Sequence, residues 1–366
     1  MKRSALVLCK YSRMGASSRL RTYQYLPFLE QNNYNIDVSC LYDDDYLQTY
    51  YRTKKRSFAK VVRCYFRRLV TLRLVYKYDV VYIEKELFPY LPALCERVLR
   101  YTGVKYIVDY DDAVFHNYDS SNNWLVRLFL SKKIDAVMKS AGTVIVGNNY
   151  LCNRAINAGA KEIQILPTVI DASRYSIKAK ASSCDTLIIG WIGSPYTQKY
   201  LLAIADDMRA LSKKIDITLR FVGANEHLLP GFHGVKVEII PWSEETEVAN
   251  IQSFDIGIMP LPDEKFEHGK CGYKLIQYMA CGIPVIASNI GVNKDIVVGS
   301  QCGLLVDATF QETDSCETVS WDKAVLAMVS DAEQYQRFSR NALEAVESVY
   351  SMQVQQQKLL TVFNEL

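Results

Sequence analysis

Residues 269–288 of this chain have the sequence GKCGYKLIQYMACGIPVIAS, which predicts a loop, a short helix and a buried strand in succession. Leu275 and Met279 recur at helical spacing. Gly282 follows the expected helix end, as glycine commonly does, and residues 284–287 form a short apolar run. A glycine-containing loop that opens a helix presents unpaired backbone N–H groups at the positive end of the helix dipole. The segment therefore predicts one α/β unit with an anionic ligand at the helix start.

The same alternation of short apolar runs and helical stretches continues along the 366 residues. Strands that alternate with helices predict parallel sheets built from βαβ units. The expected strands are 5–9, 36–41, 80–83, 106–108, 144–146, 187–192, 217–222, 235–240, 256–259 and 284–287. The expected helices are 20–31, 124–139, 199–212, 244–252, 274–279 and much of 332–366. Two series of similar length predict two doubly wound domains.

The domain boundaries are expected where the composition changes. A first Rossmann-like domain is expected at 1–172, a polar linker rich in Ser and Lys at 173–185, and a second Rossmann-like domain at 186–345. Residues 346–366 are expected to form a helix that crosses back to the first domain. A chain of this length suits two domains of ordinary size.

Composition limits the classes of function. A net charge of +3 favours no particular partner, and ten cysteines without a C-x-x-C pair disfavour a metal cage or a redox dithiol. No apolar run approaches the ~18 residues that span a bilayer. The run at 4–9 is too short for a signal peptide and predicts a strand. We therefore expect a cytoplasmic protein with free thiols and no metal cofactor.

Two loops in the first half carry candidate ligand-binding groups. Gly15 begins a loop after the first strand, and Ser17 or Ser18 is expected to cap the helix that follows, so that backbone N–H groups point at a ligand. The alternative is an ordinary capped turn. Asp111 and Asp112 belong to a D-Y-D-D run after another strand, and crowded carboxylates are costly unless they meet a cation, a hydroxyl or a reaction centre. The alternative is helix capping or solvation.

The second half offers two further candidate loops. Gly193 and Ser194 follow a strand, and Lys199 stands early in the next helix, where a cation is unfavourable unless an anion is nearby. A lysine that faces solvent is the alternative. Trp242 follows another strand, where it either packs in the core or walls a slot for a nucleobase. Lys274 adds charge at the opening loop of residues 269–288.

Beyond these individual signals, residues 190–307 resemble the nucleotide-sugar-binding domain of family-4 retaining glycosyltransferases (glycosyl transferases group 1). The resemblance lies in the order of GWIGSP, LRFVG, IIPWSEETEVANIQSFDIGIMPL, GKCGYKLIQYMACGIPVIAS and GLLVD. The first half agrees more loosely, through the Gly15 loop, YIEKE at 82–86 and VGNNYL at 146–151. The resemblance implies the α/β GT-B fold, in which two Rossmann-like domains face each other across a cleft. It also implies a UDP- or GDP-linked sugar donor held mainly by the second domain, hexosyl transfer with retention, and no obligatory metal.

The resemblance also implies roles for individual residues. The family's two glutamates, eight residues apart, fall on Gly269 and Gln277, so Gln277 is expected at the ribose and Glu267 at the donor sugar in place of Gly269. The family's phosphate-binding Arg falls on Ser194 and its Lys close to Lys199. The expected phosphate site is completed by the helix start at Gly272 and by the charges of Lys270 and Lys274. A first-domain histidine of the family falls on Asp111, and the expected catalytic groups are Asp111, Asp112 and Lys270.

Residues 52–77 form a basic, amphipathic segment. It holds ten Lys and Arg residues, no acid, and interleaved apolar side chains. Such a helix suits an anionic membrane surface, and Arg63, Arg67 and Arg68 are its expected contacts. The alternative is a solvated helix whose apolar face packs on the first domain. No nucleic-acid recognition motif accompanies the charge.

Together these features predict a peripheral protein on the inner face of the cytoplasmic membrane. It would transfer a sugar to a glycan or a lipid-linked glycan in surface polysaccharide biosynthesis, such as that of lipopolysaccharide. Two alternatives remain open. One is a nucleotide-sugar epimerase of the same fold. The other is a non-catalytic nucleotide-sugar-binding subunit, which the loss of both acids at Gly269 and Gln277 would suit.

Overall fold

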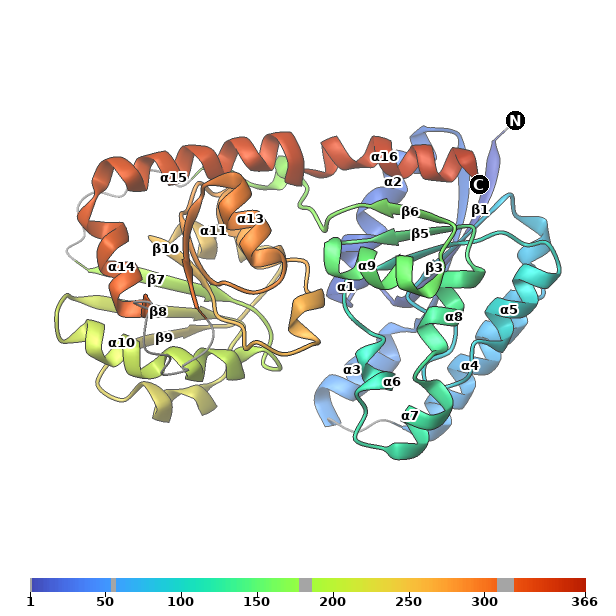
Figure 1. Ribbon diagram of the computed structural model, residues 1–366, viewed down its shortest axis with the longest axis horizontal. Helices are drawn as coiled ribbons and strands as arrows, with labels where there is room; N and C mark the ends of the chain where they lie inside the picture. Colours follow the sequence, from blue (N-terminus) through green and yellow to red (C-terminus); the bar gives the residue numbers. More distant parts are fainter. Residues whose placement is uncertain (1, 54–56, 178–185, 308–318) are drawn as a thin grey trace. The chain divides into compact units, whose positions relative to one another are not determined.

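A computed structural model describes residues 2–53, 57–177, 186–307 and 319–366, which group into two compact units (Figure 1). The first unit comprises Met1–Thr168, Gly269–Cys271 and Gln355–Leu366. The second comprises Val169–His268 and Gly272–Val354. Most of the expected linker at 173–185, namely 178–185, lies outside the described residues.

The first unit contains a six-stranded sheet in the order β2-β1-β3-β4-β5-β6. Every pairing in it is parallel, so the carboxyl ends of all six strands share one edge. The strands are β1 (Arg3–Tyr11), β2 (Tyr34–Tyr42), β3 (Val80–Glu84), β4 (Ile107–Tyr110), β5 (Thr143–Val146) and β6 (Glu162–Ile165). The loops after β1, β3 and β4, which carry the candidate groups of this unit, therefore meet at that edge.

Helices cover both faces of this first sheet. They are α1 (Ala16–Arg21), α2 (Leu26–Gln31), α3 (Asp44–Thr53), α4 (Phe58–Leu72), α5 (Leu94–Tyr101), α6 (His116–Asp119), α7 (Trp124–Leu130), α8 (Lys133–Ser140), α9 (Asn149–Ala158) and α16 (Met352–Glu365). Leu8 and Ile83 of the sheet join one core with Leu99 of α5 and Val137 of α8. Side chains of a strand alternate between its two faces, so the residues next to Leu8 and Ile83 in β1 and β3 pack on the opposite face of the sheet.

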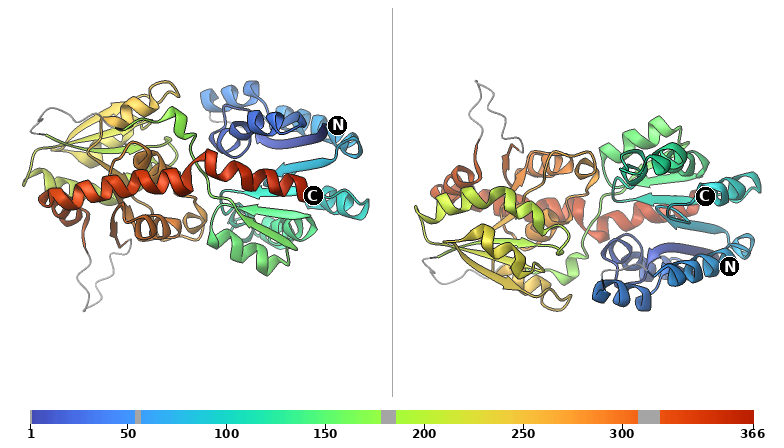
Figure 2. Two further views of the ribbon diagram at one scale, coloured as in Figure 1. Left: turned by 90° about the horizontal axis from the view of Figure 1, so that it is seen from above. Right: turned by 90° about the horizontal axis from the view of Figure 1, so that it is seen from below.

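The C-terminal helix α16 packs on that opposite face of the first unit (Figure 1, Figure 2). The Phe363 ring lies 5.5 Å from the Tyr34 ring, edge to face, and 6.0 Å from the Tyr82 ring, stacked. Tyr34 Oη also donates a hydrogen bond of 2.8 Å to Asn364 Oδ1. The prediction that the end of the chain returns to the first domain is therefore confirmed.

The second unit contains a second six-stranded parallel sheet, in the order β12-β11-β10-β7-β8-β9. Its strands are β7 (Leu187–Ile192), β8 (Ile217–Val222), β9 (Lys236–Ile240), β10 (Ile256–Met259), β11 (Val285–Ser288) and β12 (Gly303–Val306). Its helices are α10 (Ala205–Ser212), α11 (Glu247–Gln252), α12 (Tyr273–Ala280), α13 (Val292–Ser300), α14 (Trp321–Ser330) and α15 (Ala332–Ala345). The two doubly wound parallel sheets confirm the predicted fold class.

Two apolar layers enclose this second sheet. Trp191 and Phe221 belong to one core together with Met208 of α10. Val222 belongs to the other, together with Ile296 of α13. Helices α10 and α13 accordingly lie on opposite sides of the sheet (Figure 1). The buried, close-packed sheet holds the loops at its carboxyl edge in fixed positions.

The expected strands are confirmed, but three expected helices are not continuous. The helix expected at 20–31 is wrong as a single element, because α1 ends at Arg21 and α2 begins anew with Pro27 in its first turn. Proline has no N–H to continue a helix. The helix expected at 124–139 is divided into α7 and α8, and the one expected at 199–212 begins as a 3₁₀ helix at Gln198–Ile204. Among the described helices, none has both the length and the apolar character needed to cross a bilayer.

Candidate functional site

In the second unit, two glycine turns come together at the carboxyl ends of β7 and β8. Gly193 N donates to Val222 O at 3.0 Å, and Gly223 adopts a left-handed φ of +80°. A Cβ atom on Gly223 would lie 2.2 Å from Gly193 O. A Cβ atom on Gly193 would lie 2.4 Å from the Trp191 ring and 2.9 Å from Lys274 Cε. The two turns therefore have no room for a side chain at Gly193 or Gly223. The backbone at Gly193 lies close to the side chain of Lys274.

Lys274 is the second residue of α12, in its first turn, two positions after Gly272. Gly272 precedes the helix with a left-handed φ of +65°, and no side chain caps the helix N-terminus. Lys274 Nζ lies 5.4 Å from the centroid of the Trp191 ring, within the range of a cation–π interaction. A cation is unfavourable at a helix N-terminus, whereas an anion is favoured by the N–H groups and by the lysine together. The arrangement suits a phosphate at this edge of the sheet.

Ser194 and Lys199 lie on the exposed side of the turn after β7. Ser194 O accepts a hydrogen bond of 3.0 Å from Thr197 N, which closes the turn. Lys199 Nζ lies 5.5 Å from the Tyr196 ring centroid and 5.3 Å from that of Tyr200. Both predicted phosphate contacts are therefore placed at the carboxyl edge of the second sheet, and their role stays a prediction.

Glu267 is buried beside Tyr200. Its side chain is only 5% exposed, and its Oε1 accepts a hydrogen bond of 2.5 Å from Tyr200 Oη. Its Oε2 is buried with no hydrogen-bond partner among the described residues. Burial, followed by the hydrogen bond to Glu267, raises the pKa of Tyr200. The expected contact of Glu267 with the donor sugar stays a prediction, and the unpaired oxygen is compatible with it.

Gln277 and Trp242 belong to one hydrogen-bonded chain. Gln277 Nε2 donates to Tyr175 Oη at 3.2 Å, and Tyr175 Oη donates to Glu247 Oε1 at 2.9 Å. Trp242 Nε1 donates to Glu247 Oε2 at 2.8 Å. The buried carboxylate of Glu247 thereby orients the Trp242 ring, which remains 39% exposed. The exposed ring can stack on a planar group such as a nucleobase.

Two residues of this series of hydrogen bonds, Tyr175 and Glu247, were not predicted from the sequence. Tyr175 falls in the segment expected to be linker, and Glu247 lies in the helix expected at 244–252, where no contact was expected of it. Their shared contact joins residues 72 positions apart, which no local pattern shows.

In the first unit, Asp111 and Lys85 form a buried ion pair at the carboxyl ends of β3 and β4. Lys85 Nζ lies 2.8 Å from Asp111 Oδ1 and 3.7 Å from Asp112 Oδ2. Ser17 Oγ donates to Asp111 Oδ2 at 2.6 Å. The predicted residues Ser17, Asp111 and Asp112 are thus brought together, and Lys85 is an unpredicted addition to them.

The two neighbouring carboxyl groups differ in acidity. Burial raises the pKa of Asp111, but the charges of Lys85 and Arg21 and the hydrogen bonds from Lys85 and Ser17 outweigh it and lower that pKa to about 2. Burial and the adjacent Asp111 raise the pKa of Asp112, and the cations of Lys85 and Lys270 only partly oppose this. The pair therefore combines a firmly ionised group with one that holds its proton more readily.

Lys270 lies in the segment Gly269–Cys271, which is part of the first unit. Asn148 Nδ2 donates to Gly269 O at 3.0 Å and to Lys270 O at 2.9 Å. A Cβ atom on Gly269 would lie 2.4 Å from Ala113 Cβ, so this position has no room for a side chain. The segment is fixed through its backbone.

The prediction that Ser17 or Ser18 caps α1 is wrong. Gly15 is the residue that precedes the helix, and no side chain caps it. Ser18 Oγ donates instead to Glu84 Oε2 at 2.6 Å, and Ser17 Oγ donates to Asp111 Oδ2. A Cβ atom on Gly15 would lie 2.4 Å from Tyr11 Cβ, so the turn needs glycine for packing. A donor contact at Gly15 stays a prediction.

The expectation that Arg68 of the basic segment faces a membrane is wrong. Its residue is only 1% exposed, and its side chain donates to Cys9 O at 2.7 Å and to Ser39 O at 3.0 Å. It therefore ties α4 to the sheet. Arg67 donates to Asp43 Oδ2 at 2.7 Å and remains partly exposed, and Arg63 is exposed. Residues 54–56 of this segment lie outside the described residues.

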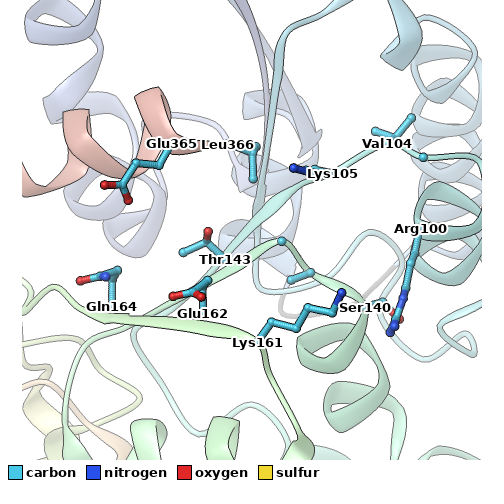
Figure 3. Close-up of a pocket in the computed structure, with 13 residues that line it drawn as sticks. Arg100, Val104, Lys105, Ser140, Thr143, Lys161, Glu162, Gln164, Glu365 and Leu366 are labelled. Carbon is cyan, nitrogen blue, oxygen red and sulfur yellow. The ribbon is translucent and has the colours of Figure 1, made fainter.

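A cavity of about 740 Å³ opens at the other, amino edge of the first sheet (Figure 3). Its lining includes Arg100, Lys161 and Glu162, and none of the predicted site residues contributes to it. Among the described residues, no group of three or more His, Cys, Asp and Glu side chains is placed to hold a metal ion.

Comparison with known proteins agrees with this architecture. Residues 186–319 match the family model for glycosyl transferases group 1, and no curated protein matches the chain. The structure is similar to sucrose-phosphate synthase from Thermosynechococcus elongatus, with a TM-score of 0.72 and 13% identity over 100% of this chain and 99% of that one. It is similar to WaaG, a glycosyltransferase involved in lipopolysaccharide biosynthesis, with a TM-score of 0.70 and 13% identity over 98% and 99%. It is also similar to HepE of Anabaena in complex with UDP, with a TM-score of 0.69 and 12% identity over 100% of both chains.

The structural likenesses show the fold, which is GT-B, and the family match assigns residues 186–319 to glycosyl transferases group 1. The chain is accordingly a glycosyltransferase of the GT-B type.

Proposed function

We propose that this glycosyltransferase moves a hexose from a UDP- or GDP-linked donor to a hydroxyl of a glycan or lipid-linked glycan, with retention of configuration, in surface polysaccharide biosynthesis. The proposal rests on one observation, namely that Lys274 lies next to the two glycine turns at the carboxyl edge of the second sheet. Ligands of open α/β sheets bind at this edge. HepE, which shares the fold, has been solved with UDP and with UDP-glucose, which supports a nucleotide sugar as the donor.

The donor would be held by groups of the second unit. Lys274, Lys199 and the N–H groups at Ser194 and Gly272 would bind the diphosphate. Gln277 would hydrogen-bond the ribose, and the exposed Trp242 ring would stack on the base. These groups need no metal, because their positive charge and N–H dipoles neutralise the diphosphate directly.

The chemistry would be mainly electrostatic. The acceptor oxygen forms a bond to the anomeric carbon, and the bond from that carbon to the diphosphate breaks with its electron pair passing to the diphosphate oxygen. Preorganised cations and N–H groups stabilise the negative charge that develops there. Positive charge develops at the sugar ring, and a nearby carboxylate would stabilise it.

Incubation with a panel of nucleotide sugars, with and without a lipid-linked glycan, tests the proposal. We expect release of UDP or GDP that depends on the acceptor, together with a glycosylated product that keeps the anomeric configuration of the donor. An isomerised donor formed without acceptor would establish the epimerase alternative. Donor binding without either product would establish the non-catalytic subunit.

We further propose that α4 of the first unit docks on the inner face of the cytoplasmic membrane. The helix exposes Phe58, Val62, Phe66 and Leu69, and Arg63 lies among them. Apolar side chains interleaved with a cation suit an anionic lipid surface. WaaG, which shares the fold, is involved in lipopolysaccharide biosynthesis, and this supports a lipid-linked acceptor.

Changing Arg63 to Gln is expected to weaken partition onto vesicles that contain anionic phospholipid by about fivefold, since one basic residue near such a surface contributes roughly 1 kcal/mol. Co-sedimentation at increasing lipid concentration measures the effect. Lys323→Gln, at an exposed position of the second unit, is the matched control and should leave partition unchanged. Equal partition of the wild type onto neutral and anionic vesicles would contradict the docking proposal.

A further inference from the structure

The cavity at the amino edge of the first sheet is lined by residues of the first unit alone. Its volume of about 740 Å³ falls within the range of about 300–1,000 Å³ that is usual for sites that hold small molecules. The candidate groups of this unit follow β1, β3 and β4 at the carboxyl edge of the same sheet. The cavity is therefore a separate place, and the proposed sugar transfer does not use it.

One end of the cavity is basic. Arg100 stands in the last turn of α5, Ser140 is the last residue of α8, and Lys161 directly precedes β6. Figure 3 shows the side chains of Arg100 and Lys161 pointing toward Ser140. Arg100 Nη1 donates to Lys139 O at 2.8 Å, which holds the guanidinium group in place while its other nitrogen atoms can bind a ligand. This end therefore presents hydrogen-bond donors that carry positive charge.

The other end of the cavity presents hydrogen-bonding groups of a different kind. Thr143 of β5 pairs with Glu162 of β6, and Gln164 lies two residues further along β6. Side chains two positions apart on a strand lie on the same face of the sheet, so these three share one face, and Figure 3 shows them together. A carboxylate only accepts hydrogen bonds, whereas a hydroxyl or an amide both accepts and donates. This end therefore suits a ligand that carries hydroxyl groups.

The protein does not neutralise these two ends itself. Within the described part of the chain, the side chains of Lys161, Thr143, Glu162 and Gln164 make no hydrogen bond or ion pair. Lys161 and Glu162 are neighbours in sequence, but successive side chains of a strand point to opposite faces of the sheet. The cationic and the anionic group are thereby kept apart, and both remain available to a ligand that spans the cavity.

We propose that this cavity is a second ligand site and that its ligand is a phosphorylated sugar. Arginine and lysine only donate hydrogen bonds, so the basic end requires an anion that accepts them. The guanidinium group of Arg100 binds two phosphate oxygens at once, and the ammonium group of Lys161 adds a point charge. The sugar hydroxyls donate to Glu162 and exchange hydrogen bonds with Thr143 and Gln164.

A phosphate suits the basic end better than a carboxylate does. A phosphate ester carries close to two negative charges and presents three acceptor oxygens, so Arg100 and Lys161 can bind it together. Lys105, which also lines the cavity, adds positive potential.

The cations alone have another explanation. Helices α5 and α8 end at this edge of the sheet, and cations near the C-terminus of a helix are favoured by its dipole. That explanation requires neither a cavity nor the row of Thr143, Glu162 and Gln164 across it. The two accounts also differ in what they affect, because interactions with helix dipoles change stability, whereas a ligand site changes binding.

Isothermal titration calorimetry of the full chain with glucose 6-phosphate, inorganic phosphate and glucose tests the proposal. We expect glucose 6-phosphate to bind about tenfold or more tightly than either of the others, because it alone reaches both ends of the cavity. Lys161→Gln should weaken the binding of both glucose 6-phosphate and phosphate about tenfold, the usual effect of losing one hydrogen bond to a charged group. Glu162→Gln should weaken the binding of glucose 6-phosphate only, because phosphate does not contact Glu162.

Two control variants locate the binding. Lys139→Gln removes an exposed lysine next to Ser140 that does not line the cavity, and it should leave every affinity unchanged. Lys274→Met, in the second unit, should also bind glucose 6-phosphate with the affinity of the wild type, which places this ligand outside the proposed donor site. Thermal melting checks that each variant is folded.

Several results would overturn the proposal. If glucose 6-phosphate binds no more tightly than phosphate, or loses as much affinity in Lys139→Gln as in Lys161→Gln, the surface merely attracts anions. If glucuronate binds as tightly as glucose 6-phosphate, the cavity does not select a phosphate. If Lys161→Gln lowers the melting temperature but keeps the affinity, the lysine serves the helix ends alone. Since the measurement is one of binding, a failure of the proposed sugar transfer would leave each of these outcomes distinct.

Discussion

Replacing Lys274 with methionine is expected to lower kcat/KM for sugar transfer about 100- to 1,000-fold, the range seen when one preorganised donor to a developing anion is removed. Lys274 lies at the start of α12, its Nζ is 5.4 Å from the Trp191 ring centroid, and its Cε lies close to Gly193. Methionine keeps an unbranched stem of similar length against that ring but lacks the charge. The loss therefore reports the interaction with the leaving diphosphate and not a change in packing.

Initial rates with saturating acceptor and varied donor measure this effect, and thermal melting checks that the variant is folded. Lys294→Met, at an exposed position of α13 in the same unit, is the matched control and should keep the wild-type rate. A rate within twofold of wild type for Lys274→Met would show that the diphosphate is bound elsewhere.

Replacing Asp109 with asparagine is expected to destabilise the first unit by about 3–5 kcal/mol, the usual cost of leaving a buried charge without its partner. Asp109 and Arg21 are each 1% exposed at the side chain. Arg21 donates to Asp109 from Nη2 at 2.5 Å and from Nε at 2.8 Å, and Tyr82 Oη also donates to Asp109 at 2.8 Å. Asparagine leaves the guanidinium buried beside a neutral amide.

Amide hydrogen exchange in β3 and β4 measures the opening free energy of the first unit separately from that of the second. Lys60→Met removes the exposed ion pair between Lys60 and Asp45 and should cost less than about 1 kcal/mol, as surface pairs usually do. Unchanged exchange in Asp109→Asn would mean that the ion pair contributes nothing to the stability of the fold.

The strands were the most predictable part of the fold. Leu187–Ile192 and Ile217–Val222 are strands with the bounds expected from their apolar runs, because a strand buried on both faces must be apolar throughout. Strand β6 was not expected. It is largely exposed, and its short sequence EIQI has no apolar run that separates it from a loop. Arg68 was misassigned for the opposite reason, since its position in a basic run conceals the fact that it is buried.

The candidate site was predictable where glycine and lysine follow strands. Gly193 and Trp242 were expected directly after strands and Lys274 at the start of a helix, and the structure has them in these positions. Their role in binding stays a prediction. Tyr175 and Lys85 were missed. Tyr175 acts through a contact with Glu247 that lies far away in sequence, and the role of Lys85 depends on a left-handed turn that no neighbouring glycine indicates.

A structure of the protein with a bound nucleotide sugar tests the central claim most directly. We predict that the diphosphate lies within hydrogen-bond distance of Lys274 Nζ and of the backbone N–H groups at Ser194 and Gly272, with the base stacked on the Trp242 ring. A nucleotide bound away from the carboxyl edge of the second sheet, or a diphosphate without contact to Lys274, would contradict the account.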